Sequence, residues 1–347
     1  MPSVQGKLEL RNIQVTKTKG TSEMHNTSTN RVSVESGGTG VAAHVGLHAL
    51  GSLADQLELG SLLSSRIVPR GRLPLHDRGK VLVQMALVLA GGGESCADIE
   101  HLRVQTNLFG SVPSDTTVFR TLHEFTAPER GQLAEALGEV RARVWAKLDT
   151  TRGPVILDFD ASLVNVSSEL KEKAAPTYKH GFGFHPLFCF ADATGETLSA
   201  KLRAGNATAN NASDHVEVLD DALAQLPLAV TQGHHAGDDP PLATRQVIAR
   251  ADNAGCTKKF LAACRERNVS FFVSARSNAQ ITGAIYATSA VPEIWQPSLE
   301  QSGEVAEHAS VCEITQYLKL STMPAGTRCI VRREPLHPGA PAQLLSQ

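Results

Sequence analysis

The chain is 347 residues long, 41% of these residues are hydrophobic, and the formal net charge at pH 7 is −2. The length allows two or three domains of about 100–200 residues each, and the composition supports a sizeable core and excludes a globally disordered protein. The near-neutral charge excludes a basic coat over the whole surface, so any contact with nucleic acid must be local.

Two features of the sequence indicate a cytoplasmic protein. The six cysteines contain no CxxC pair and match no common zinc spacing, so they are interpreted as reduced thiols. The longest apolar run, 81–90, is half as long as the ~20 residues that a membrane helix needs. The first residues lack the pattern of a signal peptide, and we expect no association with a membrane.

The first part of the chain is predicted to be helical after a polar leader. Residues 1–35 are rich in Ser, Thr, Lys and Asn without an apolar period, and we expect a flexible leader there. Residues 36–150 are predicted to form an all-α domain. Within it, apolar residues recur at helical spacing in four segments, 41–63, 77–89, 96–104 and 128–148.

Two parts of this domain carry candidate contacts to DNA. The stretch 66–80 holds five basic residues against Asp77 alone, and it is either a solvated loop or an arm whose Arg70 and Arg72 contact phosphates. Ser114 and the acid after it predict a helix start, because a hydroxyl caps free N–H groups and the helix dipole favours an acid. That helix, which includes Arg120, is either a recognition helix in a helix-turn-helix-like module or a packing helix.

From residue 151 the pattern changes to strands alternating with helices, which predicts an α/β core over 151–275. The runs 155–160 and 247–252 are almost continuously apolar, as is typical of central strands buried on both faces. Further elements are predicted as strands at 186–191, 197–202 and 270–275 and helices at 215–225 and 258–267. A mostly β segment over 276–334 follows, with strands expected at 312–320 and 328–333, and the end, 335–347, has three prolines and no packing pattern.

Both central strands end in aspartate. Side chains alternate along a strand, so Asp158 and Asp160 share one face of the first strand. A carboxylate at the end of a buried strand is costly unless it is compensated, and Mg²⁺ compensates it well because this ion prefers oxygen ligands. Asp252 repeats the arrangement, and acids from two neighbouring strands can hold two metal ions ~3.5–4 Å apart around a phosphodiester. A structural or capping role for these acids is the alternative.

Five separated motifs resemble the DDE transposases of bacterial insertion sequences and occur in that family's order. They are Gly91–Glu94, Leu108–Leu122, Asp158–Ser162, Tyr178–Leu187 and Arg250–Gly255. The chain is most similar to insertion-sequence family thirteen-eighty, over nearly its whole length after about residue 32. The resemblance implies a ribonuclease H-like mixed-sheet catalytic core, a DNA-binding N-terminal all-α domain and a mostly β insertion.

The resemblance also assigns roles to particular residues. It makes Asp160 and Asp252 the catalytic and metal-binding acids, with Asp158 as a second candidate for the first ligand or as a supporting residue. The implied cofactor is Mg²⁺, with Mn²⁺ as a substitute. Lys179 and His185 are candidates for contacts to DNA phosphates near the metal ions. The alternative is that Lys179 is an ordinary loop lysine and His185 a partly buried histidine.

The third acid of the DDE triad, a glutamate on a helix after the insertion, has no match in this sequence. Glu334 belongs to the insertion motif and is not a replacement. We therefore expect the chain to be truncated at its C-terminal end and to be inactive as this fragment.

The function implied by the resemblance is DNA transposition. Such a protein binds double-stranded DNA at terminal inverted repeats, hydrolyses a phosphodiester at each end and transfers the 3′-hydroxyl to target DNA, as a homo-oligomer on the bacterial nucleoid. The alternatives are a non-catalytic DNA-binding relic and a generic metal nuclease.

Two further residue sets have two possible roles each. Trp295 either stacks on an extruded base or packs the insertion. A second set resembles a metal cluster but lies in a loop, and it consists of His234, His235, Asp238 and Asp239.

Overall fold

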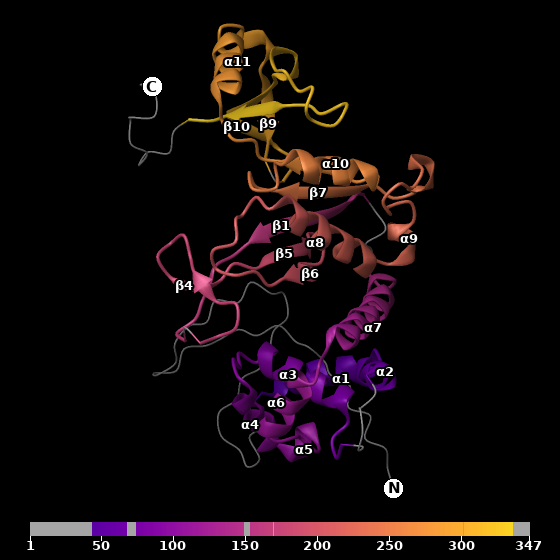
Figure 1. The fold of residues 1–347 in the computed structure, drawn as a ribbon. Helices are drawn as coiled ribbons and strands as arrows, with labels where there is room; N and C mark the ends of the chain where they lie inside the picture. The colour runs from indigo at the N-terminus through magenta and orange to yellow at the C-terminus, as the bar shows by residue number, and fades with distance from the viewer. Residues whose placement is uncertain (1–43, 68–73, 149–152, 169, 301, 336–347) are drawn as a thin grey trace, which may run out of the picture.

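A computed structural model describes residues 44–67, 74–148, 153–168, 170–300 and 302–335 of the chain. The described residues form three parts, a helical part, a central sheet with helices, and a smaller part with its own sheet, which follow one another along the molecule (Figure 1). The expected leader, 1–35, and nearly all of 335–347 lie outside the described residues. Within the described ranges, no helix combines the length and apolarity needed to cross a bilayer.

The helical part differs from the prediction at the helix expected over 41–63, which is two helices; the segment 96–104 is likewise divided, and α5 was not predicted. The chain turns at Leu57 and Glu58, and Glu58 adopts a left-handed conformation with φ 57°. The turn allows α2 to pack against α3, where a Cβ on Gly79 would lie 2.5 Å from the backbone nitrogen of Ser64. The elements of this part are α1 (Val45–Gln56), α2 (Leu59–Arg66), α3 (Arg78–Ala90), η1 (Cys96–Ile99), α4 (Glu100–Arg103), α5 (Thr106–Phe109), α6 (Asp115–His123) and α7 (Ala127–Trp145).

Helix α7 joins the helical part to the sheet (Figure 1). Near its C-terminal end, the buried Arg141 donates from Nε to Glu196 at 2.8 Å and from Nη1 to the side chain of Gln225 at 2.7 Å. Trp145 donates to the other carboxylate oxygen of Glu196 at 2.5 Å. Glu196 therefore receives two donors from one face of α7, which fixes this helix on the sheet.

The central sheet has five strands in the order β6-β5-β1-β7-β8. Strand β1 runs antiparallel to β5 and parallel to β7, and β7 runs parallel to β8. This mixed sheet confirms the predicted α/β core. Its strands are β1 (Val155–Ala161), β5 (Leu187–Ala191), β6 (Glu196–Lys201), β7 (Val247–Ala251) and β8 (Ser270–Val273), and its helices are α8 (Ala212–Gln225), α9 (Leu228–Thr231), η2 (Pro240–Leu242) and α10 (Lys258–Glu266).

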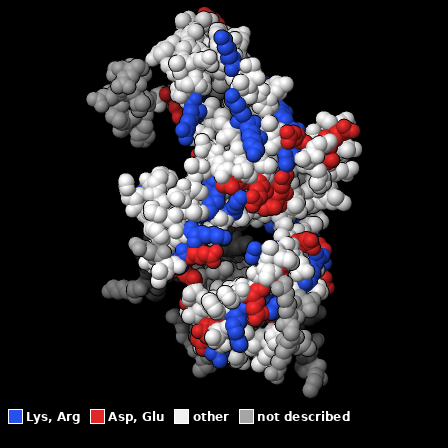
Figure 2. Space-filling model, in the orientation of Figure 1, with Lys and Arg blue, Asp and Glu red and all other residues white. Residues whose placement is uncertain are grey.

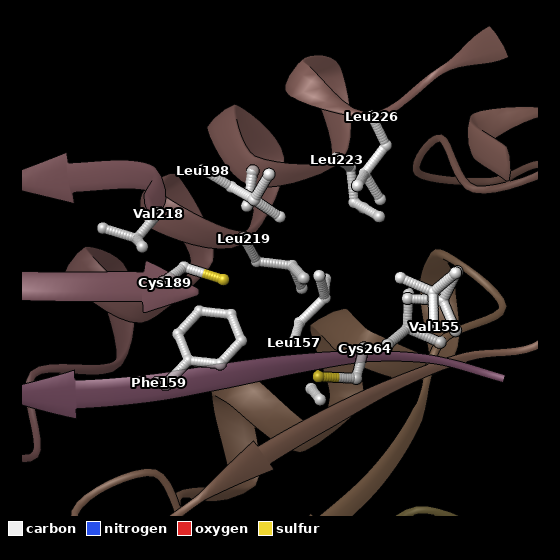
Figure 3. Packing of buried hydrophobic residues seen from close by; sticks show 14 of the residues in the cluster. Val155, Leu157, Phe159, Cys189, Leu198, Val218, Leu219, Leu223, Leu226 and Cys264 are labelled. Carbon is white, nitrogen blue, oxygen red and sulfur yellow. The ribbon is translucent and has the colours of Figure 1, made fainter. Parts of the chain in front are cut away.

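The main hydrophobic core lies between this sheet and helices α8 and α10. Leu157 and Phe159 of β1 point toward Cys189, Leu219 and Leu223 in Figure 3, and each of these residues is buried. The alternate residues of β1 are half-buried or exposed. The prediction of burial on both faces is therefore wrong for this strand, because among the described residues only one face carries the core.

All six cysteines are free thiols, as the spacing predicted. Cys189 and Cys264 lie in the main core, and burial raises the pKa of Cys264 to about 12. A thiol with so high a pKa is protonated at neutral pH and is a poor nucleophile. These two cysteines therefore contribute packing to the core.

The chain between β1 and β5 forms a small sheet, in the order β2-β4-β3, that projects from the core (Figure 1). Its strands are β2 (Val164–Asn165), β3 (Ala175–Pro176) and β4 (Phe182–Phe184). A bridge between Phe184 and Ala204 ties it to the loop after β6, and a Cβ on Gly205 would lie only 2.3 Å from the carbonyl oxygen of Ala175. We did not predict this sheet, because strands of two or three residues are too short to show an alternating pattern.

The insertion contains one helix and a three-stranded sheet in the order β11-β10-β9. The strand predicted over 312–320 is wrong: β10 ends at Glu313, and a short helical turn follows it. The indole of Trp295 is buried and donates to the carbonyl oxygen of Thr288 at 3.0 Å, so this residue packs the insertion. The elements are α11 (Ala279–Ser289), η3 (Pro292–Ile294), β9 (Gln296–Leu299), β10 (Val305–Glu313), η4 (Thr315–Tyr317) and β11 (Ile330–Arg333).

Candidate active site at two parallel strand ends

Asp160 and Asp252 lie at the carboxyl ends of neighbouring parallel strands. Phe159 of β1 is paired in register with Ala251 of β7, and both side chains are buried in the main core. The next residue in each chain segment is the aspartate, and both aspartates are exposed. Because side chains alternate along β1, the carboxylate of Asp160 lies on the sheet face opposite this core, whereas Asp252 begins the turn that follows β7.

Neither aspartate forms an ion pair with a described residue. The backbone N–H of Ala254 donates to Oδ1 of Asp252 at 2.8 Å, which holds this carboxylate in the turn that follows β7. Exposed carboxylates without a cationic partner are suitable ligands for a hard divalent cation such as Mg²⁺ or Mn²⁺. The part of the chain that the structure describes brings no three His, Cys, Asp or Glu side chains together as a metal cluster.

Asp158 lies on the same face but has another partner. Its two carboxylate oxygens accept from Nε and Nη2 of Arg250 at 2.5 and 2.6 Å, and Arg250 also donates to Asp192 at 2.6 Å. The hydrogen bond that Arg250 donates to Asp158 is the main cause that raises the pKa of Arg250 above its usual range. This ion pair links β1 to β7 two residues before the exposed acids.

His215 is a residue near the site that we did not predict. It lies in α8, buried against the rings of Phe159 and Phe260 at centroid distances of 6.3 and 5.2 Å, and its Nδ1–H donates to the carbonyl oxygen of Asn211 at 2.9 Å. Burial lowers the pKa of His215, and the charge of Asp252 acts in the opposite direction. The residue was not predictable because its proximity to Asp252 depends on how α8 packs on the sheet.

The predicted DNA contacts lie in different environments. Lys179 is exposed beside Tyr178, and Arg120 is exposed on α6. His185 is only 3% exposed and its Nδ1 lies 2.9 Å from the carbonyl oxygen of Ala207, so the alternative of a buried histidine describes it better. Arg70 and Arg72 lie outside the described residues.

The loop that resembled a metal cluster is held by ordinary hydrogen bonds. Both ring nitrogens of His234 lie 2.9 Å from carbonyl oxygens, those of Arg267 and Arg245, and His235 bonds to Asp238 at 3.2 Å. Because each ring nitrogen faces a carbonyl oxygen at hydrogen-bond distance, neither is open to a metal ion. His234 is therefore a structural residue of this loop.

The order and directions of the strands, together with the helices before them and the β-rich segment after them, define a ribonuclease H-like fold with an N-terminal all-α domain and a mostly β insertion. Residues 24–343 match a family model described as transposase DDE domain group 1, and the chain belongs to this family of DDE transposases.

Comparison with solved structures gives weak similarities. The catalytic domain of Mos1 mariner transposase has a TM-score of 0.24 and 12% identity, over 48% of this chain and 72% of that chain. The Mos1 mariner paired end complex with Mn has a TM-score of 0.23 and 11% identity, over 70% and 73%. The simian T-cell lymphotropic virus intasome in complex with PP2A regulatory subunit B56 gamma has a TM-score of 0.22 and 17% identity, over 54% of each chain. No curated protein matches the sequence.

Proposed function

We propose that the protein cleaves the ends of an insertion sequence related to family thirteen-eighty and transfers the freed 3′-hydroxyl to target DNA. One observation carries the proposal: in a chain of the DDE transposase family, two exposed acids follow a registered residue pair at the ends of parallel strands. In the proposed mechanism, Asp160 and Asp252 are the acids that hold Mg²⁺, for which Mn²⁺ can substitute.

The other residues of the site have supporting roles in this proposal. Divalent ions held by the two carboxylates supply activation of the attacking oxygen and stabilisation of the leaving oxygen. The ion pair of Asp158 with Arg250 fixes the spacing of β1 and β7, so that the exposed acids stay at one distance. Rigid support of this kind matters because active groups must be held within ~0.5 Å of their productive positions.

Double-stranded DNA is the proposed partner, both at the terminal inverted repeats and at the target. The helical domain, 36–150, is the proposed binding domain, and Arg120 on α6 is its proposed phosphate contact. Lys179, in the turn between β3 and β4, is the proposed phosphate contact of the core. Both side chains are exposed, and exposed cations near a duplex replace condensed counterions. His185 is not included, because a buried ring cannot reach a phosphate. Cleavage of paired ends implies an oligomer on DNA.

The test is a cleavage assay with a duplex that carries the inverted repeats flanking the gene, in the presence of Mg²⁺ or Mn²⁺. In a chain that also carries the third acid of the triad, we expect cleavage at the repeat end, its loss in Asp160→Asn and Asp252→Asn, and its retention in Asp239→Asn, which changes an exposed aspartate elsewhere. A duplex of scrambled sequence is the second control. Binding of the repeats without any cleavage would support a non-catalytic relic, and equal cleavage of the scrambled duplex would support a generic nuclease.

A further inference from the structure

A cavity of about 900 Å³ lies between the core and the insertion and begins beside the candidate active site. Its core wall includes Asn253, the residue after Asp252, and Phe272 of β8. Its insertion wall includes Lys319 and Arg332. The cavity therefore leads from the turn that holds Asp252 toward the insertion sheet.

Phe272 lies on the sheet face that carries Asp158 and Asp160. It is paired in register with Arg250, whose side chain contacts Asp158 on that face. Its ring is 67% exposed, although β8 is a strand of the central sheet. An exposed aromatic ring at the wall of this cavity offers a stacking surface for a planar group.

The cavity is positively charged. Four basic residues and no Asp or Glu line it, in a chain whose formal net charge is −2. Arg328 and Arg332 are paired with Glu313 and Glu334. The two others, Arg276 and Lys319, are exposed and form no ion pair with a described residue, and in Figure 2 Lys and Arg side chains are spaced down the insertion toward the core.

The size of the cavity decides which form of nucleic acid it can hold. Sites of roughly 300–1,000 Å³ take ligands of small-molecule size. A space of about 900 Å³ accommodates a few unpaired nucleotides and has no room for a duplex. Cationic side chains for the phosphates and an aromatic ring for a base are the usual components of a single-strand site.

We infer that this cavity binds unpaired nucleotides of a DNA end, with a base stacked on Phe272 and phosphates beside Arg276 and Lys319. The inference rests on the proposed function, because it assigns the strand that leaves the cleavage site to this cavity. The amide side chains of Asn253 and Gln280, which also line the cavity, add hydrogen-bonding groups for base edges. Stacking accepts any base, so the site is expected to tolerate many sequences.

The test compares two labelled duplexes of one sequence by fluorescence anisotropy, one blunt and one with a tail of three unpaired thymidines at the repeat end. We expect the tail to tighten binding by about ten-fold, the effect of stacking one base. In Phe272→Ala this advantage is expected to disappear while affinity for the blunt duplex stays unchanged. Tyr286→Ala, which removes an exposed aromatic ring of α11 that does not line the cavity, is expected to keep the advantage.

The charged wall is tested with the same two duplexes at several salt concentrations. Lys319→Ala is expected to reduce the salt dependence of binding for the tailed duplex by about 0.7 in logarithmic slope, the value for one phosphate of a single strand. Lys259→Ala, an exposed lysine of α10 outside the cavity, is the matched control. The inference is overturned if the tail adds no affinity, or if Phe272→Ala weakens both duplexes equally. Failure to bind either duplex would instead contradict the proposed function.

Discussion

Replacement of Arg141 by methionine tests how strongly α7 is attached to the central sheet. Methionine keeps most of the aliphatic stem and removes the guanidinium, so the loss is confined to the polar contacts. These are the 2.8 Å ion pair with Glu196, the 2.7 Å hydrogen bond to the Gln225 side chain, and longer bonds to the carbonyl oxygens of Gln225 and Thr197 at 3.1 and 3.4 Å. Breaking a fully buried pair costs about 3–5 kcal/mol. The Glu196 side chain is 31% exposed and keeps its bond from Trp145, so we expect about 2–3 kcal/mol of lost stability.

The assay is urea unfolding followed by circular dichroism, with Arg143→Met as the control. Arg143 lies two residues further along α7, is exposed, and pairs with Glu58 at 3.1 Å, so its replacement is expected to cost about 0–1 kcal/mol. A double-mutant cycle with Glu196→Gln then isolates the coupling between the two charges. Equal free energies of unfolding for the Arg141 and Arg143 variants would refute the reasoning, because burial would then make no difference to the value of the contact.

Two further predictions concern stability. Burial lowers the pKa of His215, so the unfolded chain binds the proton of this residue more tightly than the folded chain does. The contribution of neutral His215 to the free energy of unfolding is therefore complete above the ordinary pKa of 6.5. It is lost as the pH falls toward the pKa of the folded state. Urea titrations at several pH values should show this loss in the wild type and a weaker loss in His215→Phe, and parallel curves would contradict it. Gly205→Ala should lower Tm, because its Cβ would lie 2.3 Å from the carbonyl oxygen of Ala175. Gly131→Ala, in open space within α7, should stabilise by about 0.5–1 kcal/mol, and a decrease in both variants would show that space is not the cause.

The elements that the sequence predicted best are those with a strong apolar pattern. The run 155–160 became β1, the run 247–252 became β7, and the helix predicted over 128–148 became α7 with its ends shifted by one to three residues. In each of these segments, several residues contribute to the same apolar pattern. The strand predicted over 312–320 is wrong beyond Glu313. The apolar residues Ile314 and Leu318 pack into the insertion on either side of a helical turn, and not as members of a strand.

The sequence predicted which residues of β1 share a face, but it did not predict the partners of the candidate acids. Strand alternation placed Asp158 and Asp160 on one face, as the structure has them. That Arg250 occupies both oxygens of Asp158 depends on the register between β1 and β7, which no local pattern contains. The same holds for the cavity, whose walls at Asn253 and Lys319 come from distant parts of the chain.

The double contact of Glu196 has a consequence for chimeric proteins. Glu196 opens β6, yet two of its donors, Arg141 and Trp145, come from α7, which precedes the core in the sequence. An exchange of N-terminal segments between relatives would have to join the chains ahead of residue 127, so that the helix and its carboxylate stay together. A junction at the apparent boundary near residue 150 would combine the α7 of one relative with the Glu196 position of another, so the contacts of Arg141 and Trp145 could be lost.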